Sequence, residues 1–325
     1  MKKLRLGIIG TSDIAFRRFL PALQKGGHFT YAGVASRQIE KTQPFIQSFG
    51  GKGYANYEEL ICSDDVDVLY IPLPPALHFE WAKKALMHGK HVLLEKPSTI
   101  SLKDTQALVA IAKENNLALQ ENYMFQYHSQ LSYVQKVQRE NKLGDFRLIR
   151  IAFGFPMRGT SDFRYNERLG GGALLDCGGY TVKLATILLG ESIKLTASRL
   201  NYTNEFDVDL FGSATFENED GLTAQVSFGM DNAYQCQLEI WGSKQTLIAP
   251  RIFTAGDGFK PQIILKSSSD IKTIELESDD QFLNSIVNFY QYVQSDELRE
   301  DSYNKMELQS KLIESILNVE RKKYL

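Results

Sequence analysis

Cysteine, net charge and long apolar runs are all scarce in this sequence, and each shortage excludes a class of protein. The three cysteines among 325 residues, Cys62, Cys177 and Cys236, have no metal-binding or redox spacing. A formal net charge of −2 lacks the basic field that nucleic acid or an anionic membrane requires. No run reaches the roughly 18 apolar residues of a membrane span. We therefore expect a cytoplasmic protein that binds no metal, nucleic acid or membrane.

The first part of the chain, residues 1–122, alternates short apolar strands with helices of about 10 to 15 residues. The strands are expected at "LRLGIIG", "TYAGVAS", "DVDVLYIPL", "KHVLLEKP" and "LALQENY". This alternation is typical of a parallel, doubly wound sheet, whose ligands bind at the carboxyl ends of its strands. Residues 1–122 are thus predicted to form a dinucleotide-binding domain.

The second part, residues 123–325, has a different rhythm. A linking helix near "SQLSYVQKVQREN" precedes eight strand-like segments separated by turn signals such as "ENEDG" and "TAGDG". One helix, "GGALLDCGGYTVKLATILLG", interrupts them, and an amphipathic helix near residues 304–322 closes the chain. We expect an open, mainly antiparallel sheet with one face covered by a helix and the other by a second subunit, in a homodimer or homotetramer. The predicted fold class is α/β followed by α+β.

The turn after the first predicted strand is similar to a dinucleotide-binding fingerprint. Gly10 would supply the tight turn, Ser12 stands where the second glycine is usual, and Ala15 stands at the third. Serine is small and its hydroxyl can donate to a phosphate, so Ser12 would modify the site without abolishing it. A tight turn in an unrelated α/β domain is the alternative. The candidate residues are Gly10, Thr11, Ser12, Asp13, Ile14 and Ala15.

The end of the second predicted strand indicates which dinucleotide binds. A free ribose 2′-hydroxyl is usually met there by Asp or Glu, whereas this chain has Ser36 and Arg37, with Lys41 one turn later. A hydroxyl and two cations suit a 2′-phosphate. The sequence thus predicts NADP(H) in preference to NAD(H), with an ordinary charged strand end as the alternative.

Three further motifs carry a resemblance to a known family: "LLEKP" ending at Pro97, "ENYMF" from Glu121, and "GGGALLDCGGY" ending at Tyr180. With "GIIGTSDIA" they resemble the glucose–fructose oxidoreductase/inositol dehydrogenase (Gfo/Idh/MocA) family over essentially the whole chain. The resemblance implies a Rossmann domain, a second domain built on an open sheet, and an active site between them. Most members carry Asp-x-Gly-x-His where this chain has Asp176 to Tyr180. That tyrosine is similar to the branch of sugar-nucleotide 3-ketoreductases, which use NADPH.

The chemistry of ketone reduction suits the residues of these motifs. It needs a hydride donor, a proton donor, and positive potential where the alkoxide develops. We assign Tyr180 as general acid, since a nearby ammonium makes a phenol a readier proton donor. Lys96 would polarise the carbonyl, orient Tyr180 or donate the proton itself. Asp176, four residues before Tyr180 and so on one helix face with it, would fix the substrate or a neighbouring side chain. A packing tyrosine and a lysine at a loop entry are the alternatives.

The same resemblance implies lesser candidates. Cofactor contacts are expected from Leu73, His78, Glu95, Lys96 and Asn122, and a substrate diphosphate would be held by Arg158 and Arg164. A helix start, a turn or a charged loop tip is the structural alternative at these positions.

The functional hypothesis is NADPH-dependent reduction of the C3 keto group of a nucleotide-linked keto-deoxysugar. A dehydrogenase of a free sugar, polyol or trans-dihydrodiol is the first alternative. Such enzymes more commonly have histidine at the position of Tyr180 and an acidic residue at the second strand end. A non-catalytic NADP-sensing regulator is the second alternative, and the presence of Lys96 disfavours it.

Overall fold

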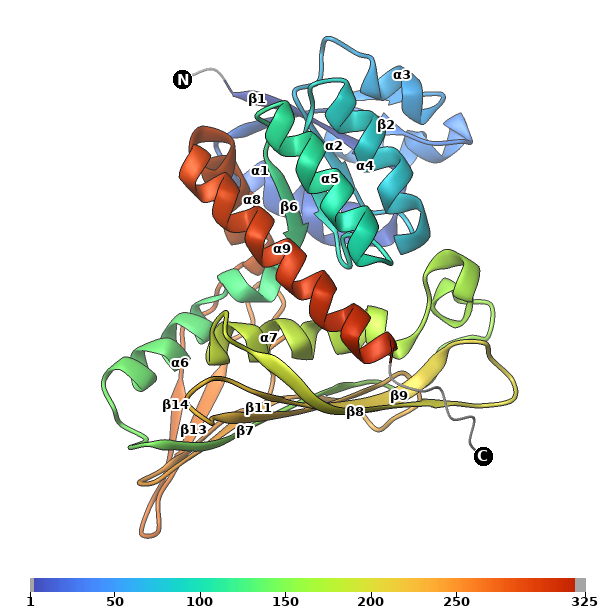
Figure 1. Cartoon of the computed structure of the whole chain (residues 1–325). Helices are drawn as coiled ribbons and strands as arrows, with labels where there is room; N and C mark the ends of the chain where they lie inside the picture. Colours follow the sequence, from blue (N-terminus) through green and yellow to red (C-terminus); the bar gives the residue numbers. More distant parts are fainter. Residues whose placement is uncertain (1–2, 319–325) are drawn as a thin grey trace. The chain divides into compact units, whose positions relative to one another are not determined.

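The computed structural model describes residues 3–318, and their contacts form two compact units (Figure 1). The first unit contains Met1–Asn122 and Phe282–Ser310, and the second contains Tyr123–Gln281 and Lys311–Leu325. A domain boundary after residue 122 stays a prediction. As compact units, however, residues 282–310 group with the first part of the chain.

The first unit is built on a six-stranded parallel sheet with strand order β3-β2-β1-β4-β5-β6, as expected for a Rossmann fold. Its central strands are almost entirely apolar because helices cover both faces. The order reverses between β1 and β4, which places a ligand-binding crevice at their carboxyl ends. The strands are β1 (Leu4–Ile9), β2 (Phe29–Ala35), β3 (Lys52–Tyr54), β4 (Val68–Ile71), β5 (His91–Glu95) and β6 (Leu119–Asn122).

The helices of the first unit include several that the sequence did not predict. The predicted ones are η1 (Ala15–Phe19), α1 (Leu20–Lys25), η2 (Ile39–Thr42), α2 (Gln43–Phe49), α4 (His78–Met87) and α5 (Leu102–Glu114). The additional elements are β3, α3 (Tyr57–Ile61), the short turn η3 (Pro75–Leu77) and α8 (Gln281–Gln294). An arrangement similar to a capping box begins α3: Asn56, the N-cap residue, accepts the N–H of Glu59 (2.7 Å), and Glu59 accepts the N–H of Ala55, one residue before the cap (3.1 Å).

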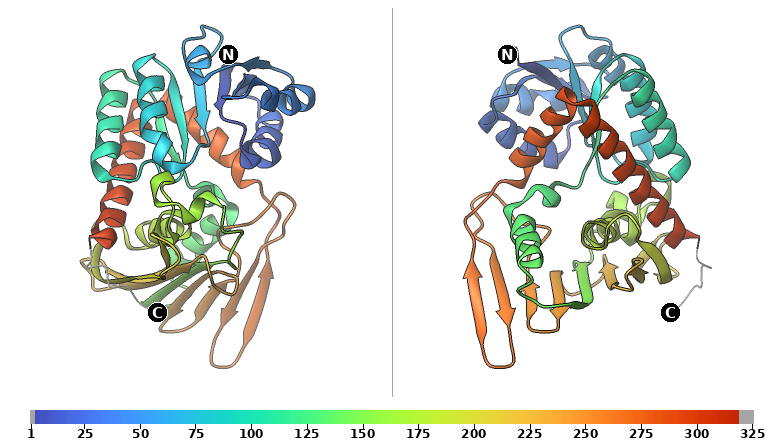
Figure 2. Two further views of the ribbon diagram at one scale, coloured as in Figure 1. Left: turned by 90° about the vertical axis from the view of Figure 1, so that its right-hand side faces the viewer. Right: turned by 60° about the vertical axis from the view of Figure 1, so that its left-hand side comes forward.

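The closing helix, α9 (Asp296–Leu317), begins earlier than predicted and lies beside α5 (Figures 1 and 2). The predicted end near residue 322 lies outside the described residues. An ion pair joins Lys113 of α5 to Glu300 of α9 (2.7 Å). The phenol of Tyr303 also donates to the carbonyl of Leu117, just before β6. These contacts tie the late part of the chain to the Rossmann sheet.

The second unit contains all eight predicted strands in one sheet, with order β14-β13-β12-β11-β7-β10-β9-β8. Every neighbouring pair is antiparallel except β10 and β7, which run parallel. The predicted mainly antiparallel sheet is thus confirmed. The strands are β7 (Phe146–Gly154), β8 (Lys194–Tyr202), β9 (Asp209–Glu217), β10 (Thr223–Gly229), β11 (Gln235–Gly242), β12 (Thr246–Ala249), β13 (Gln262–Lys266) and β14 (Ile271–Glu275).

Only one face of this sheet is buried. In β10, Ala224, Val226 and Phe228 are buried, whereas Gln225 and Ser227 between them are exposed. The buried face packs on η7 (Leu174–Gly178) and α7 (Gly179–Leu189), which lie across the sheet in Figure 1. The unit also contains η4 (Met124–Tyr127), α6 (Ser129–Arg139), η5 (Phe163–Tyr165) and η6 (Glu167–Leu169).

The helical stretch Glu167–Leu189 corrects the expectation that no segment has the character of a membrane span. It is long and apolar enough to cross a membrane, with a mean hydropathy of 1.2. However, 83% of its apolar window is buried inside the fold. Its apolarity is explained by its place as the core helix of the second unit.

Candidate active site

The nucleotide turn lies where the strand order of the first sheet reverses. Gly10 adopts a φ of +97°, and a Cβ there would lie 2.7 Å from Cδ2 of Leu73 in the loop after β4. The positive φ favours glycine at this turn, and a Cβ would also displace the end of the Leu73 side chain. Ser12 Oγ accepts the N–H of Ala15 (3.3 Å), so the serine supports the start of the following helix. An accepting hydroxyl keeps its proton for a second partner, which fits a phosphate.

The residues predicted to meet the ribose phosphate stand at the end of β2. Ser36 is buried and accepts the N–H of Gln38 (3.3 Å), whereas Arg37 and Lys41 are exposed. The sequence missed Tyr57 of α3, whose hydroxyl lies 3.9 Å from the position of a Cβ on Gly10. Burial raises the pKa of Tyr57, and the charge of Arg37 and a hydrogen bond to it act in the opposite direction. The "NYEE" capping box was the available signal for α3.

His78 is fully buried and joins the loop after β4 to the loop after β5. Its Nδ1 lies 2.8 Å from the carbonyl oxygen of Pro97, and its Nε2 lies 2.7 Å from that of Leu73. Burial lowers the pKa of His78 to about 4, although both carbonyls favour the protonated ring. A neutral ring donates to one of the two carbonyls only. Both ring nitrogens of His78 thus face backbone carbonyls, on the loops that carry Leu73 and Lys96.

Glu95 and Asn122 form a buried pair at the ends of β5 and β6. Asn122 Nδ2 and the phenol of Tyr70 each donate to Glu95 Oε1, both over 2.8 Å. Burial raises the pKa of Glu95, opposed by these two hydrogen bonds and by the charge of Lys96. Lys96 follows directly and is partly exposed. The Lys96 ammonium therefore lies at the carboxyl edge of the sheet, next in sequence to the Glu95 carboxyl group, which Tyr70 and Asn122 hold.

Tyr180 lies at the start of α7, directly after the π-helical turn η7. Such π-turns are frequent at functional sites because they reorient side chains. The Tyr180 phenol donates to Sδ of Met124 (3.6 Å), and the ring is 9% exposed. Four aromatic rings surround it at centroid distances of 5.1 to 5.8 Å: Tyr123, Phe125, Phe153 and Phe253. A weak sulfur acceptor can readily yield the hydroxyl to a stronger partner.

Asp176, on the preceding turn, binds a neighbouring side chain. Its Oδ2 accepts a hydrogen bond from Nε of Arg164 (2.7 Å), and Nη1 of Arg164 lies 3.1 Å from Oδ1 of Asp162. Burial lowers the pKa of Arg164, but these two carboxylates outweigh it and raise that pKa. Arg158 is half-exposed and stacks over the ring of Phe155 (5.1 Å). Arg164 is thus fixed in place, while Arg158 lies at the surface.

The structure places the predicted residues in two groups. The cofactor candidates and Lys96 lie at the carboxyl ends of strands in the first unit. Arg158, Arg164, Asp176 and Tyr180 lie in the second unit. Among residues 3–318, no group of three or more His, Cys, Asp or Glu side chains could hold a metal ion.

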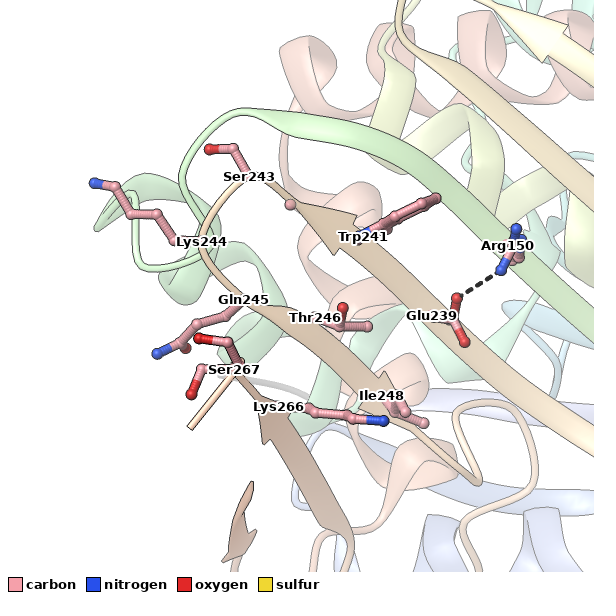
Figure 3. Close-up of a pocket in the computed structure, with 12 residues that line it drawn as sticks. Arg150, Glu239, Trp241, Ser243, Lys244, Gln245, Thr246, Ile248, Lys266 and Ser267 are labelled. Carbon is pink, nitrogen blue, oxygen red and sulfur yellow. Dashed lines mark hydrogen bonds and ion pairs between the residues drawn. The ribbon is translucent and has the colours of Figure 1, made fainter. Parts of the chain in front are cut away.

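A hollow of about 490 Å³ lies elsewhere, at the exposed face of the second sheet (Figure 3). Its lining includes Arg150, Glu239, Trp241 and Lys266, and it contains none of the predicted site residues. An ion pair between Arg150 and Glu239 crosses it (3.1 Å). We attribute this hollow to the uncovered sheet face, since residues of the exposed face such as Glu239 and Trp241 line it.

Comparison with known proteins defines the class. Residues 4–123 match the model of an oxidoreductase family with an NAD-binding Rossmann fold, and residues 131–248 match a GFO/IDH/MocA C-terminal domain. The chain therefore belongs to the Gfo/Idh/MocA oxidoreductase family, as the motifs predicted.

Individual relatives refine this placement. The chain is 38% identical to a dTDP-3,4-didehydro-2,6-dideoxy-alpha-D-glucose 3-reductase of Actinomadura kijaniata, over 90% of this chain and 89% of that protein. It is 27% identical to a D-xylose 1-dehydrogenase (NADP(+)) of Haloferax volcanii, over 96% and 97% of the two chains. A solved 3-ketoreductase of A. kijaniata with NADP and TDP-benzene superimposes with a TM-score of 0.96, at 35% identity and over all of both chains. Solved variants of that enzyme replace a lysine with alanine or a tyrosine with phenylalanine.

Proposed function

We propose that this protein reduces the C3 keto group of a nucleotide-linked keto-deoxysugar with NADPH. The observation that carries the proposal is Tyr180: a buried tyrosine stands at the second-unit position where most family members have histidine. The similarity to dTDP-sugar 3-reductases over 90% of the chain supports the same substrate class.

The residues at the carboxyl edge of the first sheet fit NADP(H). The turn at Gly10 has a positive φ that favours glycine, and Ser12 retains a hydroxyl proton for the pyrophosphate. Arg37 and Lys41 are exposed cations suited to a ribose 2′-phosphate. When bound, NADPH supplies the hydride that converts the ketone into an alkoxide.

Residues of the protein then stabilise the negative charge of the alkoxide and donate a proton to it. Lys96 places a positive charge beside the carbonyl oxygen and stabilises the developing alkoxide. Tyr180 exchanges its weak bond to Met124 for a hydrogen bond to that oxygen and donates its proton. The aromatic rings around Tyr180 exclude water and strengthen both interactions. Asp176 holds Arg164, which binds the substrate diphosphate, and Arg158 adds an outer cation.

The test is NADPH oxidation, with NADH in parallel, across a panel of candidate substrates. The panel contains dTDP- and UDP-linked 3-keto and 3,4-diketo hexoses, free sugars and a trans-dihydrodiol. We expect turnover with the nucleotide-linked ketones, and faster with NADPH than with NADH. Turnover restricted to free sugars or diols would contradict the proposal.

Oxidation of a free sugar is the second candidate, because the chain aligns with nearly the full length of a D-xylose 1-dehydrogenase. Tyr180 and the Ser36-Arg37 strand end count against it, since catabolic members more commonly have histidine and an acidic residue there. Turnover of D-xylose with NADP⁺ would favour this alternative.

We further propose that the enzyme is a cytoplasmic homodimer or homotetramer joined through the exposed face of the second sheet. That face carries the half-exposed ring of Trp241 beside Arg150, within the hollow of Figure 3. A broad sheet with one bare face is a usual site of subunit association.

A further inference from the structure

Side chains of β6 and α8 form a continuous line of hydrogen bonds that ends on the Glu95 carboxylate. Asn288 Nδ2 donates to Gln120 Oε1 (3.3 Å), and Gln120 Nε2 donates to Ser285 Oγ (3.1 Å). Ser285 Oγ donates to Asn122 Oδ1 (2.6 Å), and Asn122 Nδ2 donates to Glu95 Oε1 (2.8 Å). Gln120, Asn122, Ser285 and Glu95 are all buried, so water does not compete for these bonds.

The carboxylate sets the direction of this line. Glu95 accepts hydrogen bonds from the Tyr70 phenol, the Lys96 N–H and Asn122 Nδ2, so Asn122 presents its amino group to Glu95. The carbonyl oxygen of Asn122 then faces Ser285, whose hydroxyl must donate. The oxygen of Ser285 in turn accepts from Gln120. Every donor points toward Glu95, and such aligned dipoles reinforce one another and stabilise negative charge at the end of the line.

Both oxygens of Glu95 are held. The phenol of Tyr70 donates to Oε1 (2.8 Å), and its ring stacks on Phe19 with centroids 3.8 Å apart. The backbone N–H of Lys96 donates to Oε2 (3.3 Å). The carboxylate is thereby fixed next to the lysine that we propose as the electrophilic group of the reaction. The negative charge of the carboxylate and the positive charge of that lysine attract each other.

We propose that Ser285 is a positioning residue: it orders the Asn122 amide, which fixes the Glu95 carboxylate and through it the Lys96 ammonium. This inference rests on the role of Lys96 in the proposed function. It gives α8, a helix for which the sequence offered no functional motif, a part in the chemistry of the carboxyl edge. Gln120 and Asn288 extend the same support.

The first test compares the activity of Ser285→Ala with that of Ser302→Ala, in which a second buried serine is replaced. Loss of one buried hydrogen bond in the line should lower kcat roughly tenfold. The KM values for NADPH and for the nucleotide sugar should stay within about twofold. Ser285→Thr keeps the hydroxyl and should restore kcat. Ser302→Ala is the control, because Ser302 is also buried and its Oγ donates to the carbonyl of Leu119 on β6 (2.9 Å), outside the line.

A double variant asks whether Ser285 acts through Lys96. In a Lys96→Ala background, Ser285→Ala should cause little further loss of residual activity, because the group that it positions is already gone. Asn288→Ala, half-buried at the far end of the line, provides a second entry should Ser285→Ala not fold, and a smaller drop in kcat is expected. Additive losses, or equal losses in Ser285→Ala and Ser302→Ala, would overturn the proposal.

A measurement without substrate separates this proposal from the proposed function. Reductive methylation of Lys96 by formaldehyde and borohydride, followed by peptide mass spectrometry, should be several-fold faster in Ser285→Ala than in the wild type or Ser302→Ala. If the wild type reduces no sugar but the methylation rates differ in this way, the proposed function fails and the positioning role stands. If all three proteins are methylated equally, the positioning role is refuted whatever the substrate.

Discussion

Lys96 and Tyr180 are the two side chains on which the proposed proton and charge chemistry depends. Replacing Lys96 with Ala or Tyr180 with Phe should lower kcat on the order of a hundredfold or more, the usual contribution of a positioned acid or electrostatic group. Steady-state kinetics measure this loss. The Kd for NADPH, measured by fluorescence titration, should change by less than about threefold.

The control for the tyrosine is Tyr303→Phe, which also removes a buried phenol, one bonded to a backbone carbonyl away from the site. It should keep near wild-type turnover. If Lys96→Ala and Tyr180→Phe also kept near wild-type rates, the assignment of both residues would be wrong.

The lowered pKa of His78 predicts how the free energy of unfolding depends on pH. Its pKa is lowered to about 4 in the folded protein, so between about pH 6.5 and 4 the unfolded chain binds the extra proton. The free energy of unfolding should therefore fall as the pH falls through that window. At about 1.4 kcal/mol per unit, His78 accounts for about 3 kcal/mol of this loss by pH 4. His91, also lowered to about 4 by burial, adds to it.

Urea unfolding of His78→Gln across pH 4 to 7 measures this effect. The variant should be less stable at pH 7, because the ring joins two loops, and should lose less stability on acidification than the wild type. His88→Gln is the control, since His88 is exposed at the end of α4. An unchanged pH slope in His78→Gln would contradict the account.

Some properties of single residues could be predicted from the sequence and others could not. Gly10 adopts the positive φ of a tight turn, as its place after the first strand indicated, and its contact with a cofactor stays a prediction. The sequence placed His78 and Glu95 among cofactor contacts, and that stays a prediction; the structure shows both bonded within the protein. Their partners, Pro97, Leu73, Tyr70 and Asn122, lie 5 to 27 residues away along the chain, at spacings that no local pattern records.

At the scale of elements, the end of β2 is expected to select the cofactor. Arg37→Ala should raise the KM for NADPH roughly 10- to 100-fold, the value of a charge-assisted hydrogen bond, and leave that for NADH nearly unchanged. Paired kinetics with both cofactors measure the difference. Arg18→Ala, an exposed arginine on the first helix, is the control. Equal effects on NADPH and NADH would show that Arg37 does not read the 2′-phosphate.

Elements with strong periodicity were predicted well. All eight strands of the second sheet and five of the six in the first could be recognised from alternation or continuous apolar runs. β3 and α3 were missed because they span three and five residues, too short for a periodic signal. The parallel pairing of β7 with β10 could not be predicted, since neighbours in a sheet are decided by long-range packing. The π-turn before Tyr180 likewise leaves no pattern in the sequence.

At the scale of the whole molecule, the exposed face of the second sheet predicts self-association. Trp241→Asp replaces a half-exposed ring of this face with a charge and should shift the protein from a dimer or tetramer toward the mass of one chain. Light scattering coupled to size-exclusion chromatography measures this mass. Met87→Asp, at an exposed apolar residue of the first unit, is the control. A wild type that already has the mass of one chain would refute the proposed association.

The grouping of residues 282–310 with the first unit is another property of the whole molecule. A chain division after residue 122 follows the change from alternating to strand-rich sequence, yet α8 returns to the first sheet. The contacts responsible join α8 to β6, and α9 to α5, to β6 and to Leu117 just before β6, at separations of 165 to 205 residues. The sequence of an amphipathic helix near the end of the chain does not indicate which of the two preceding sheets the helix will pack on.

The central claim is the reduction of C3 on a nucleotide-linked sugar, and deuterium transfer tests it most directly. NADPH deuterated at C4 of the nicotinamide is incubated with the enzyme and a dTDP-linked 3-keto or 3,4-diketo deoxyhexose, and the product is examined by NMR. We predict deuterium at C3 of the nucleotide-linked sugar. The variants Lys96→Ala and Tyr180→Phe should transfer almost no deuterium. Deuterium at another carbon, or transfer to free sugars alone, would contradict the account.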